Sequence, residues 1–286
     1  MVYPLKGKQV ERIVGEALAE DLAYGDVTTE ALVLSELKGK AAILVKRDGV
    51  LAGIDVAKEV FRQVDPSLRF KALVKDGAKV PKGDVVATVE GKMASILKAE
   101  RTALNFLQHL SGIATETARY VDAVSGTKAV ITDTRKTIPG LRLLEKYAVR
   151  TGGGHNHRLN LGDGVLIKDN NLAALRSSGI GLGETVKKAR QRAPRAMKVE
   201  VEVESVKQSQ EALSAGADII MLDNMNVKDM RRVVKLVQGR ALLEASGGIT
   251  LDNVRSVAEA GVDLISVGAL THSARALDIS LEVEPG

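Results

Sequence analysis

The segment Val199–Glu204, in which valine and glutamate alternate, is the part of this sequence that most clearly indicates chemistry. Side chains of a β-strand point alternately to its two faces, so the three valines share one face and Glu200, Glu202 and Glu204 share the other. On a solvated antiparallel sheet the glutamates would form an exposed acidic face. In a barrel strand the valines would face the surrounding helices and the glutamates would face the lumen.

Carboxylates inside a barrel need positive charge nearby, because burial and like charges both disfavour their ionisation. The candidate cations are Arg135, Lys136 and Lys168, each of which follows a short apolar segment. A divalent metal shared between Glu202 and Asp223 would serve the same purpose. Mg²⁺ suits such a site because it binds one or two carboxylates together with substrate oxygens. The carboxylates therefore predict a site for a charged substrate, with Mg²⁺ as cofactor.

A glycine-rich loop at residues 152–158 adds further candidate groups. Arg158, together with Arg135 and Lys136, forms a set suited to carboxylates, since a guanidinium can bind one through two hydrogen bonds. Each arginine taken alone could be solvated surface charge. The loop also contains a His-x-His pair, but no third nitrogen or sulfur ligand for zinc stands out. The loop is therefore a candidate for binding a small anion.

Two glycine clusters are candidates for binding phosphate. Ser246-Gly247-Gly248 precedes a segment of helical character, and Gly268-Ala269 follows the last apolar segment. Backbone N–H groups at the start of a helix bind phosphate, and in α/β barrels phosphate commonly binds after the last two strands. Turns from strand to helix also need glycine for steric reasons, so either cluster alone would be a weak indication.

These candidates follow short β-branched segments, most of which are themselves followed by a helical stretch. This rhythm predicts successive βα units and a parallel sheet. A closed barrel of six to eight strands fits better than a doubly wound sheet, because no GxGxxG motif follows the first strand. In such barrels the active site lies just past the C-terminal ends of the strands. The predicted strands are Ala129–Thr132, Val165–Ile167, Val199–Val203, Ile219–Leu222, Ala241–Leu243 and Leu264–Val267.

The first 95 residues predict a small α+β sandwich, and a long helix leads from it to the barrel. The helix is expected over Ala99–Val124, where Ala103, Leu107, Leu110, Ala114, Ala118 and Val121 form one apolar face. The other predicted elements are a helix at residues 10–18, a turn or loop at Gly25–Thr29, strands at Ala41–Lys46, Phe70–Val74 and Val85–Val89, and a helix at Asp55–Val64. The predicted domains are residues 1–112 for the sandwich, 113–273 for the barrel, and 274–286 for a C-terminal segment that returns to the sandwich.

Composition narrows the class of protein. The chain has 286 residues with a net charge of +5, three Phe, four Tyr, no Trp and no Cys. The core must therefore be aliphatic, and disulfides and thiolate zinc sites are excluded. No basic cluster is interleaved with aromatic residues, so no nucleic-acid partner is expected. Residues 1–6 have no apolar core of signal-peptide length, and no apolar run approaches the roughly 20 residues needed to span a membrane, so a cytoplasmic protein is expected.

Several independent motifs together resemble those of quinolinate phosphoribosyltransferase, also called nicotinate-nucleotide pyrophosphorylase (carboxylating). The similarity runs in order from about residue 20 to the C-terminus. The motifs are Gly25–Thr29, Glu100–Asn105, Leu110–Thr115, Asp133–Thr137, Gly152–Arg158, Leu166–Asn170, the Val-Glu repeat, Leu222–Asn224, Ser246–Ile249 and Gly268–Ser273.

The resemblance implies a fold, an activity and an assembly. The fold would be an N-terminal α+β sandwich and a C-terminal α/β barrel that is incomplete, with about seven strands. The reaction would transfer phosphoribosyl from phosphoribosyl pyrophosphate to quinolinate and release pyrophosphate and CO₂, giving nicotinate mononucleotide for NAD biosynthesis. The assembly would be a homodimer, or a larger oligomer of dimers, in which Arg101 reaches the neighbouring subunit's active site.

The same resemblance implies roles for individual residues, four of which, Lys136, Lys168, Glu202 and Asp223, would be catalytic. Glu202 and Asp223 would bind the ribose hydroxyls and Mg²⁺. The carboxylates of quinolinate would be held by Arg135, Lys136, His157, Arg158 and Lys168. Phosphate would be held by Ser246, Gly247 and Gly248 and by Val267, Gly268 and Ala269, and Thr134 belongs to the same substrate-binding set.

One position departs from the family pattern, and two other functions stay open. Asn171 stands where the family usually has His after Lys-Asp-Asn, and asparagine cannot become a cation at neutral pH. The nearer alternative is a phosphoribosyltransferase for another acid such as nicotinate. The other is a non-catalytic ligand-binding or carrier module, in which Lys92 would carry a lipoyl or biotinyl group; paired short strands with glycine turns explain that pattern equally well.

Overall fold

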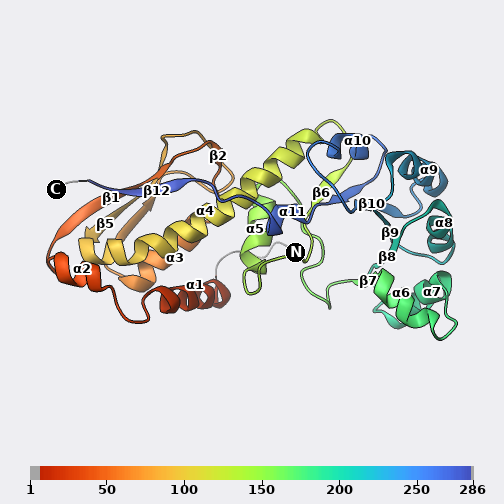
Figure 1. Ribbon diagram of the computed structural model, residues 1–286, viewed down its shortest axis with the longest axis horizontal. Coiled ribbons are helices and arrows are strands. Elements are labelled where there is room, and N and C mark those ends of the chain that lie inside the picture. Colours follow the sequence, from red (N-terminus) through yellow and green to blue (C-terminus); the bar gives the residue numbers. More distant parts are fainter. Residues whose placement is uncertain (1–6, 285–286) are drawn as a thin grey trace. The chain divides into compact units, whose positions relative to one another are not determined.

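The computed structural model describes residues 7–284, which fall into two units (Figure 1). The sandwich unit contains residues 7–118, 137–153 and 270–284, and the barrel unit contains residues 119–136 and 154–269. Residues 137–153, placed in the barrel on sequence grounds, group with the sandwich unit instead. The expectation that no signal peptide begins the chain concerns residues 1–6, which lie outside the described residues.

The sandwich unit is built on a four-stranded antiparallel sheet in the order β12-β1-β5-β3. The C-terminal strand pairs with the first strand of the chain, with Ile279 opposite Val45. The last residues therefore return to the sheet of this unit. The strands are β1 (Lys38–Val45), β3 (Arg69–Ala72), β5 (Val85–Lys92) and β12 (Ile279–Glu284), and a separate pair consists of β2 (Gly49–Val50) and β4 (Lys79–Val80).

Amphipathic helices accompany this sheet. Helix α3 buries Ile54, Val56, Ala57, Val60 and Phe61, which recur at helical spacing on one face. The helices of the unit are α1 (Lys8–Asp21), α2 (Val27–Leu32), α3 (Ile54–Val64), α4 (Met93–Ala123), whose last residues belong to the barrel unit, and α5 (Arg142–Thr151).

The prediction of a turn or loop over Gly25–Thr29 was wrong for its second half. Gly25 has a φ of 79°, which makes a turn, but α2 begins at Val27. Asp26 caps this helix, because its Oδ1 accepts a hydrogen bond from the Thr29 N–H at 2.9 Å. Asp26 and Thr29 thus form the start of a short helix, whereas only a turn or loop was predicted here.

Helix α4 confirms the predicted long helix and extends it toward the N-terminus by starting at Met93. Ala103, Leu107, Leu110 and Ala114 of the predicted apolar face are buried. Gly112 allows a close approach within the sandwich unit, since a Cβ there would lie 2.2 Å from the carbonyl oxygen of Arg275. The returning C-terminal segment therefore packs directly on the backbone of α4.

The barrel unit contains six parallel strands in the order β6-β11-β10-β9-β8-β7. The first strand in sequence, β6, pairs with the last, β11, so the sheet curls into a barrel. The barrel stays open between β6 and β7. A single bridge between Thr132 and His155 lies on the open side of β6. The predicted incomplete barrel is confirmed, but the described residues contain six strands and this bridge instead of about seven strands. The strands are β6 (Val130–Thr132), β7 (Val165–Ile167), β8 (Val199–Val203), β9 (Ile219–Asp223), β10 (Leu242–Ser246) and β11 (Leu264–Ser266).

Helices follow most of these strands, as βα units require. They are α6 (Asp169–Arg176), α7 (Leu182–Arg192), α8 (Val206–Ser214), α9 (Val227–Val237), α10 (Val254–Ala258) and α11 (Ala269–His272), the last of which belongs to the barrel unit only at Ala269. No helix within residues 7–284 is both long and apolar enough to cross a membrane.

The register of the strands places particular side chains in rows across the barrel. Glu202 of β8 and Glu244 of β10 both lie opposite Met221 of β9, and Asp223 lies opposite Ser246 one row further on. Cα partners on neighbouring strands present their side chains to the same face of a sheet. The row of strand-end residues therefore faces the same side as the glutamates of β8.

Candidate active site

All of the predicted site residues except Arg101 lie in the barrel unit. Arg101 is an exposed residue of α4 in the sandwich unit. The barrel unit contains Thr134, Arg135, Lys136, His157, Arg158, Lys168, Glu202, Asp223, Ser246, Gly247, Gly248, Val267, Gly268 and Ala269.

An ion pair joins two of the predicted catalytic residues at the ends of neighbouring strands. The Lys168 Nζ lies 3.0 Å from Glu202 Oε1, and the Asp169 N–H donates to Glu202 Oε2 at 3.3 Å. Glu202 is fairly deep, with 14% of its side chain exposed, whereas Lys168 is 47% exposed. The Glu202 carboxylate therefore has a defined orientation and a compensating charge.

Glu202 and Asp223 line the same cavity, which has a volume of about 250 Å³. Asp169 and Asn170 at the start of α6 also line it. Since β8 and β9 are paired neighbours, both carboxylates come from the C-terminal half of adjacent strands. In α/β barrels this end holds the active site.

Gly247 has a steric function next to Asp223. Asn224 donates from its side-chain amide to Asp223 Oδ2 at 2.9 Å, and its own backbone is left-handed, with a φ of 52°. A Cβ on Gly247 would lie 2.2 Å from Asn224 Oδ1. Gly248 differs, because no heavy atom lies within 4 Å of the position its Cβ would occupy. Only Gly247 is required by the packing around Asn224.

The expectation that Ser246-Gly247-Gly248 directly precedes a helix was wrong. Helix α10 begins at Val254, after an intervening turn in which Asn253 donates to the Gly248 carbonyl oxygen at 2.8 Å. The two glycines have positive φ angles of 88° and 60°, so they form a tight turn rather than a helix start. After β11, by contrast, α11 does begin directly after Gly268.

Two arginines lie close together in the barrel unit. Burial lowers the pKa of Arg158, and the positive charge of Arg135 lowers it further. The Arg158 Nη1 donates to the Gly164 carbonyl oxygen at 3.1 Å. Lys136, also predicted here, is exposed, and its N–H donates to Thr134 Oγ1 at 3.0 Å. Two neighbouring guanidinium groups repel each other, so a bound anion would stabilise this arrangement.

The segment that leads to Arg158 is tied to the end of β6. His155 donates its N–H to the Ile131 carbonyl oxygen at 2.8 Å. The fully buried Asp133 then accepts the His157 N–H at 2.9 Å and the Asn156 side-chain amide at 2.5 Å. Short-range hydrogen bonds to a buried carboxylate give the loop one backbone conformation.

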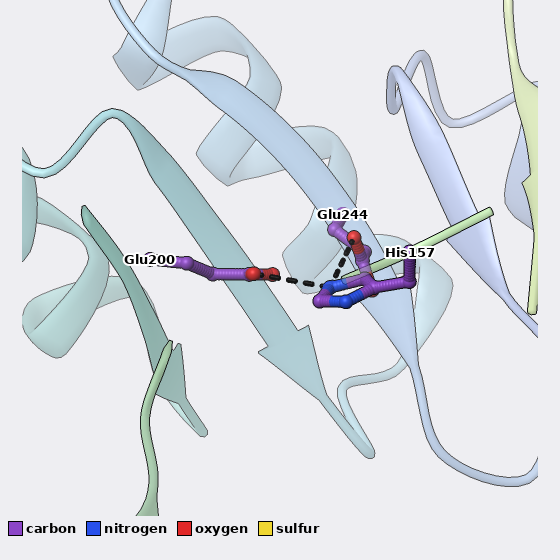
Figure 2. Close-up of side chains that lie close together, drawn as sticks. All are labelled: His157, Glu200 and Glu244. Carbon is purple, nitrogen blue, oxygen red and sulfur yellow. Dashed lines mark ion pairs between the residues drawn. The ribbon is translucent and has the colours of Figure 1, made fainter. Parts of the chain in front are cut away.

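The imidazole of His157 has partners at both ring nitrogens. Its Nδ1 accepts the Arg158 N–H at 2.8 Å. Its Nε2 lies 3.0 Å from Glu200 Oε2 and 3.6 Å from Glu244 Oε2, as Figure 2 shows. An unprotonated Nδ1 places the proton of the neutral ring on Nε2, which is then the donor toward Glu200 Oε2.

His157, Glu200 and Glu244 are also the described residues whose ligand atoms are close enough to hold a metal ion. A metal at Nε2 would require that nitrogen to be unprotonated. Because Nδ1 already accepts the Arg158 amide, the neutral ring must keep its proton on Nε2. The hydrogen-bonding pattern therefore fits a protonated Nε2 better than a metal at this cluster.

Burial raises the pKa of Glu244 to about 7, with a further increase from the nearby negative charge of Glu200. Glu244 has no exposed surface and lies in the middle of β10, between Leu243 and Ala245. A carboxyl group with such a pKa holds a proton over much of the neutral range.

This raised pKa predicts how stability depends on pH. The stabilising contribution of protonated Glu244 is complete below its unfolded-state pKa of about 4.5 and is lost as pH rises through about 7. We expect Glu244→Gln, which mimics the protonated side chain, to raise the free energy of unfolding at pH 8 by up to about 3 kcal/mol. Urea unfolding at pH 5 and pH 8 measures the effect, with Glu259→Gln on the exposed surface as control. An unchanged pH dependence in Glu244→Gln would contradict this expectation.

A larger cavity, of about 600 Å³, is lined by this cluster. Its walls include His157, Arg158, Glu200 and Glu244, but also Val165 and Ile219, the first residues of their strands. It therefore reaches the cluster from the N-terminal ends of the strands. Arg158 lines this larger cavity, whereas the strand-end carboxylates Glu202 and Asp223 line the smaller one.

Comparison with known proteins decides the family. The protein-family model for the quinolinate phosphoribosyl transferase C-terminal domain matches residues 113–282. The family model for the N-terminal domain matches residues 26–111. This chain belongs to the quinolinate phosphoribosyltransferase family. The predicted family is thereby confirmed.

Individual relatives agree over nearly their whole length. The chain is 44% identical over 275 residues to a probable nicotinate-nucleotide pyrophosphorylase (carboxylating) of Bacillus subtilis, covering 96% of this chain and 93% of the relative. It is 46% identical to the nicotinate-nucleotide pyrophosphorylase (carboxylating) of Mycobacterium leprae, covering 94% and 95%. The structure of the nicotinate-nucleotide pyrophosphorylase from Francisella tularensis superposes with a TM-score of 0.90 at 42% identity, covering 98% of each chain.

Asn171, the departure from the usual pattern of this family, has a definite local function. Its Oδ1 accepts the Lys168 N–H at 2.9 Å at the start of α6. The side chain thus satisfies the backbone N–H of a predicted catalytic residue, Lys168.

Several residues of the site were not among those predicted. Glu244 was missed, although one carboxylate in an apolar strand was a usable signal. Glu200 was noticed as a polar strand residue and Asp133 as part of the motif that follows the first strand, but nothing in the sequence showed that they converge on His157. Asn156 was named only as part of the loop. Contacts between strands that are distant in sequence decide these partnerships.

Proposed function

We propose that this chain is a quinolinate phosphoribosyltransferase of NAD biosynthesis, which transfers phosphoribosyl from phosphoribosyl pyrophosphate to quinolinate with loss of CO₂. The observation that supports it most is the pairing of two functions in one barrel unit: the anchored carboxylate of Glu202 and the neighbouring guanidinium groups of Arg135 and Arg158. The first suits an electron-poor sugar carbon, and the second suits a dianionic acid.

In the first step, the pyridine nitrogen forms a bond to the sugar carbon while the bond to pyrophosphate breaks. Positive charge develops on the sugar, and the carboxylates of Glu202 and Asp223, which line one cavity, would stabilise it. Lys168 compensates the negative charge of Glu202 and would also stabilise the negative charge of the leaving pyrophosphate. In the second step, the 2-carboxylate leaves as CO₂ and a proton replaces it, which the cationic pyridinium ring makes possible.

The acid would be held by its carboxylates. Arg135 and Arg158 are the principal candidates. Lys136 and Lys168 are further candidates, because they follow strands β6 and β7 in the sequence. Holding both carboxylates orients the ring nitrogen toward the sugar, so the protein's contribution is largely positioning and electrostatics.

Mg²⁺ is part of this proposal. Glu202 and Asp223 provide oxygen donors to one cavity, and Mg²⁺ commonly binds one or two carboxylates together with substrate phosphates. Bound there with the substrate, the ion would neutralise charge on the pyrophosphate leaving group.

The assembly and location are proposed on family grounds. A homodimer would explain why Arg101, an exposed residue of the sandwich unit, belongs to a family motif, because it would reach the partner's active site. A cytoplasmic location fits the composition.

We expect Gly248→Ala to test the phosphate site at residues 246–248. The methyl group enters open space, so the fold should survive at a cost of about 1 kcal/mol for the left-handed backbone. A methyl in a phosphate site would raise the KM for phosphoribosyl pyrophosphate about 10-fold, equivalent to about 1.4 kcal/mol. Gly216→Ala is the matched control, with a φ of 88° and open space in the same unit. An unchanged KM in Gly248→Ala would show that this turn does not bind phosphate.

The activity itself is tested by supplying Mg²⁺ and phosphoribosyl pyrophosphate with either quinolinate or nicotinate. Nucleotide and CO₂ from quinolinate alone would support the proposal. Nucleotide from nicotinate without CO₂ would keep the transferase and change its substrate. No product from either acid would refute the proposal and favour a non-catalytic relative.

A further inference from the structure

We infer that Glu200 is a positioning residue for the carboxylate-binding subsite, and that it acts through His157 on Arg158 as a hydrogen-bond acceptor rather than as a charge. This inference rests on the proposed function, because it assumes that Arg158 binds a carboxylate of quinolinate. It assigns a role to a buried glutamate that lies two residues before the predicted catalytic Glu202 on strand β8.

The first step of the argument is the contact between Glu200 and the ring. Glu200 is 4% exposed, and its Oε2 lies 3.0 Å from His157 Nε2. A donor is needed at Nε2, because a buried carboxylate oxygen this close to an unprotonated nitrogen would be repelled. Glu200 therefore favours the ring tautomer that has its proton on Nε2.

The second step concerns the opposite side of the ring. With the proton on Nε2, His157 Nδ1 has a free lone pair, and it accepts the Arg158 N–H at 2.8 Å. The other tautomer, or the doubly protonated ring, would place an N–H against that amide. The tautomer selected by Glu200 thus determines whether the backbone at Arg158 can keep its present position.

The third step concerns the rest of the segment. Asp133 accepts the His157 N–H at 2.9 Å, which holds the backbone just before Arg158. Arg158 itself donates from Nη1 to the Gly164 carbonyl oxygen at 3.1 Å. The ring of His157 is the link between this loop and strand β8, as Figure 2 shows by the approach of Glu200. A shift of the Arg158 backbone by a fraction of an ångström would misplace its guanidinium relative to a carboxylate.

This arrangement changes the expected role of His157. Both ring nitrogens are engaged with groups of the protein, one with Glu200 and one with the Arg158 amide. His157 therefore supports the subsite as a neutral hydrogen-bonding link, and the positive charge that faces the substrate is supplied by Arg158.

The test compares Glu200→Gln with Glu200→Met in the full-length protein. Glutamine keeps an oxygen that can accept the Nε2 proton, whereas methionine has a similar size and no such acceptor. We expect Glu200→Met to raise the KM for quinolinate about 10-fold or more, with the KM for phosphoribosyl pyrophosphate changed less than about 2-fold. Glu200→Gln should stay within about 3-fold of the wild-type protein for both substrates.

Three kinetic results would overturn the inference. They are an unchanged quinolinate KM in Glu200→Met, an equal rise in KM for both substrates, and damage in Glu200→Gln as large as in Glu200→Met. The last result would mean that Glu200 acts through its charge. A wild-type protein that does not convert quinolinate would instead refute the proposed function.

A spectroscopic measurement on the wild-type protein tests the inference without an activity assay. The chain has only four histidines, so ¹⁵N-detected NMR of the imidazole side chains can resolve His157. We expect a neutral ring with the proton on Nε2 in the wild-type protein and in Glu200→Gln. An imidazolium, or a ring protonated on Nδ1, would overturn the inference whatever the kinetics show.

Discussion

Glu202→Gln is expected to lower kcat about 100- to 1,000-fold, the range found when one preorganised electrostatic group is removed from a transition state. The Glu202 carboxylate is held at both oxygens, because Lys168 pairs with one and the Asp169 N–H donates to the other. Glutamine keeps the size of the side chain but not its negative charge. The charge that develops on the sugar during transfer would then be met only by Asp223.

The measurement is kcat and KM with both substrates at saturating Mg²⁺. Glu259→Gln is the control, since it makes the same change of charge on an exposed residue of the barrel unit, half of whose side chain faces solvent. Turnover of Glu202→Gln within a few-fold of the control would show that this carboxylate does not act in the transition state.

Arg158→Met is expected to lower kcat/KM for quinolinate about 100-fold or more, because truncating one member of a charge-assisted pair costs about 2–5 kcal/mol. Burial already lowers the pKa of Arg158, and Arg135 lowers it further, so the free protein tolerates a strained pair of cations that an anion would relieve. Methionine retains the apolar part of the side chain and removes the charge.

The loss should appear with quinolinate and be much smaller for phosphoribosyl pyrophosphate. Initial-rate kinetics with each substrate varied in turn separate the two effects. Arg232→Met is the matched control, because Arg232 is 60% exposed and pairs only with Asp229 of its own helix among the contacts of the described residues. Equal losses for both substrates would place Arg158 outside the carboxylate subsite.

The elements that carry the chemistry could be predicted because their signals are local. The strand Val199–Val203 was predicted with its observed bounds, since valine alternates with glutamate over its whole length. Strand β7 was also predicted with its observed bounds, Val165–Ile167. Strand β10 was placed too early, at Ala241–Leu243 rather than Leu242–Ser246, so its prediction left out Glu244.

That error at β10 had a consequence for the site. A carboxylate in the middle of a strand is expected to be exposed. Its burial could not be inferred without knowing that the side chains of Glu200 and His157 lie close to it. The Ser246-Gly247-Gly248 cluster shows the same limit. Its glycines were attributed to phosphate or to a tight turn, whereas Gly247 must also leave room for Asn224.

The sequence by itself determined the class of this protein: βα units, an aliphatic core, cations and carboxylates at successive strand ends, and motifs whose order indicates the family. These features are local in the chain, and hydrophobic periodicity and residue type encode them directly. Only the tertiary structure decided which charges meet. Lys168 pairs with Glu202, and His157 lies close to Glu200 and Glu244, because the parallel strands of the barrel bring together residues that are many positions apart in the sequence. Contacts between residues so far apart in the sequence depend on strand register and burial, which no local pattern specifies.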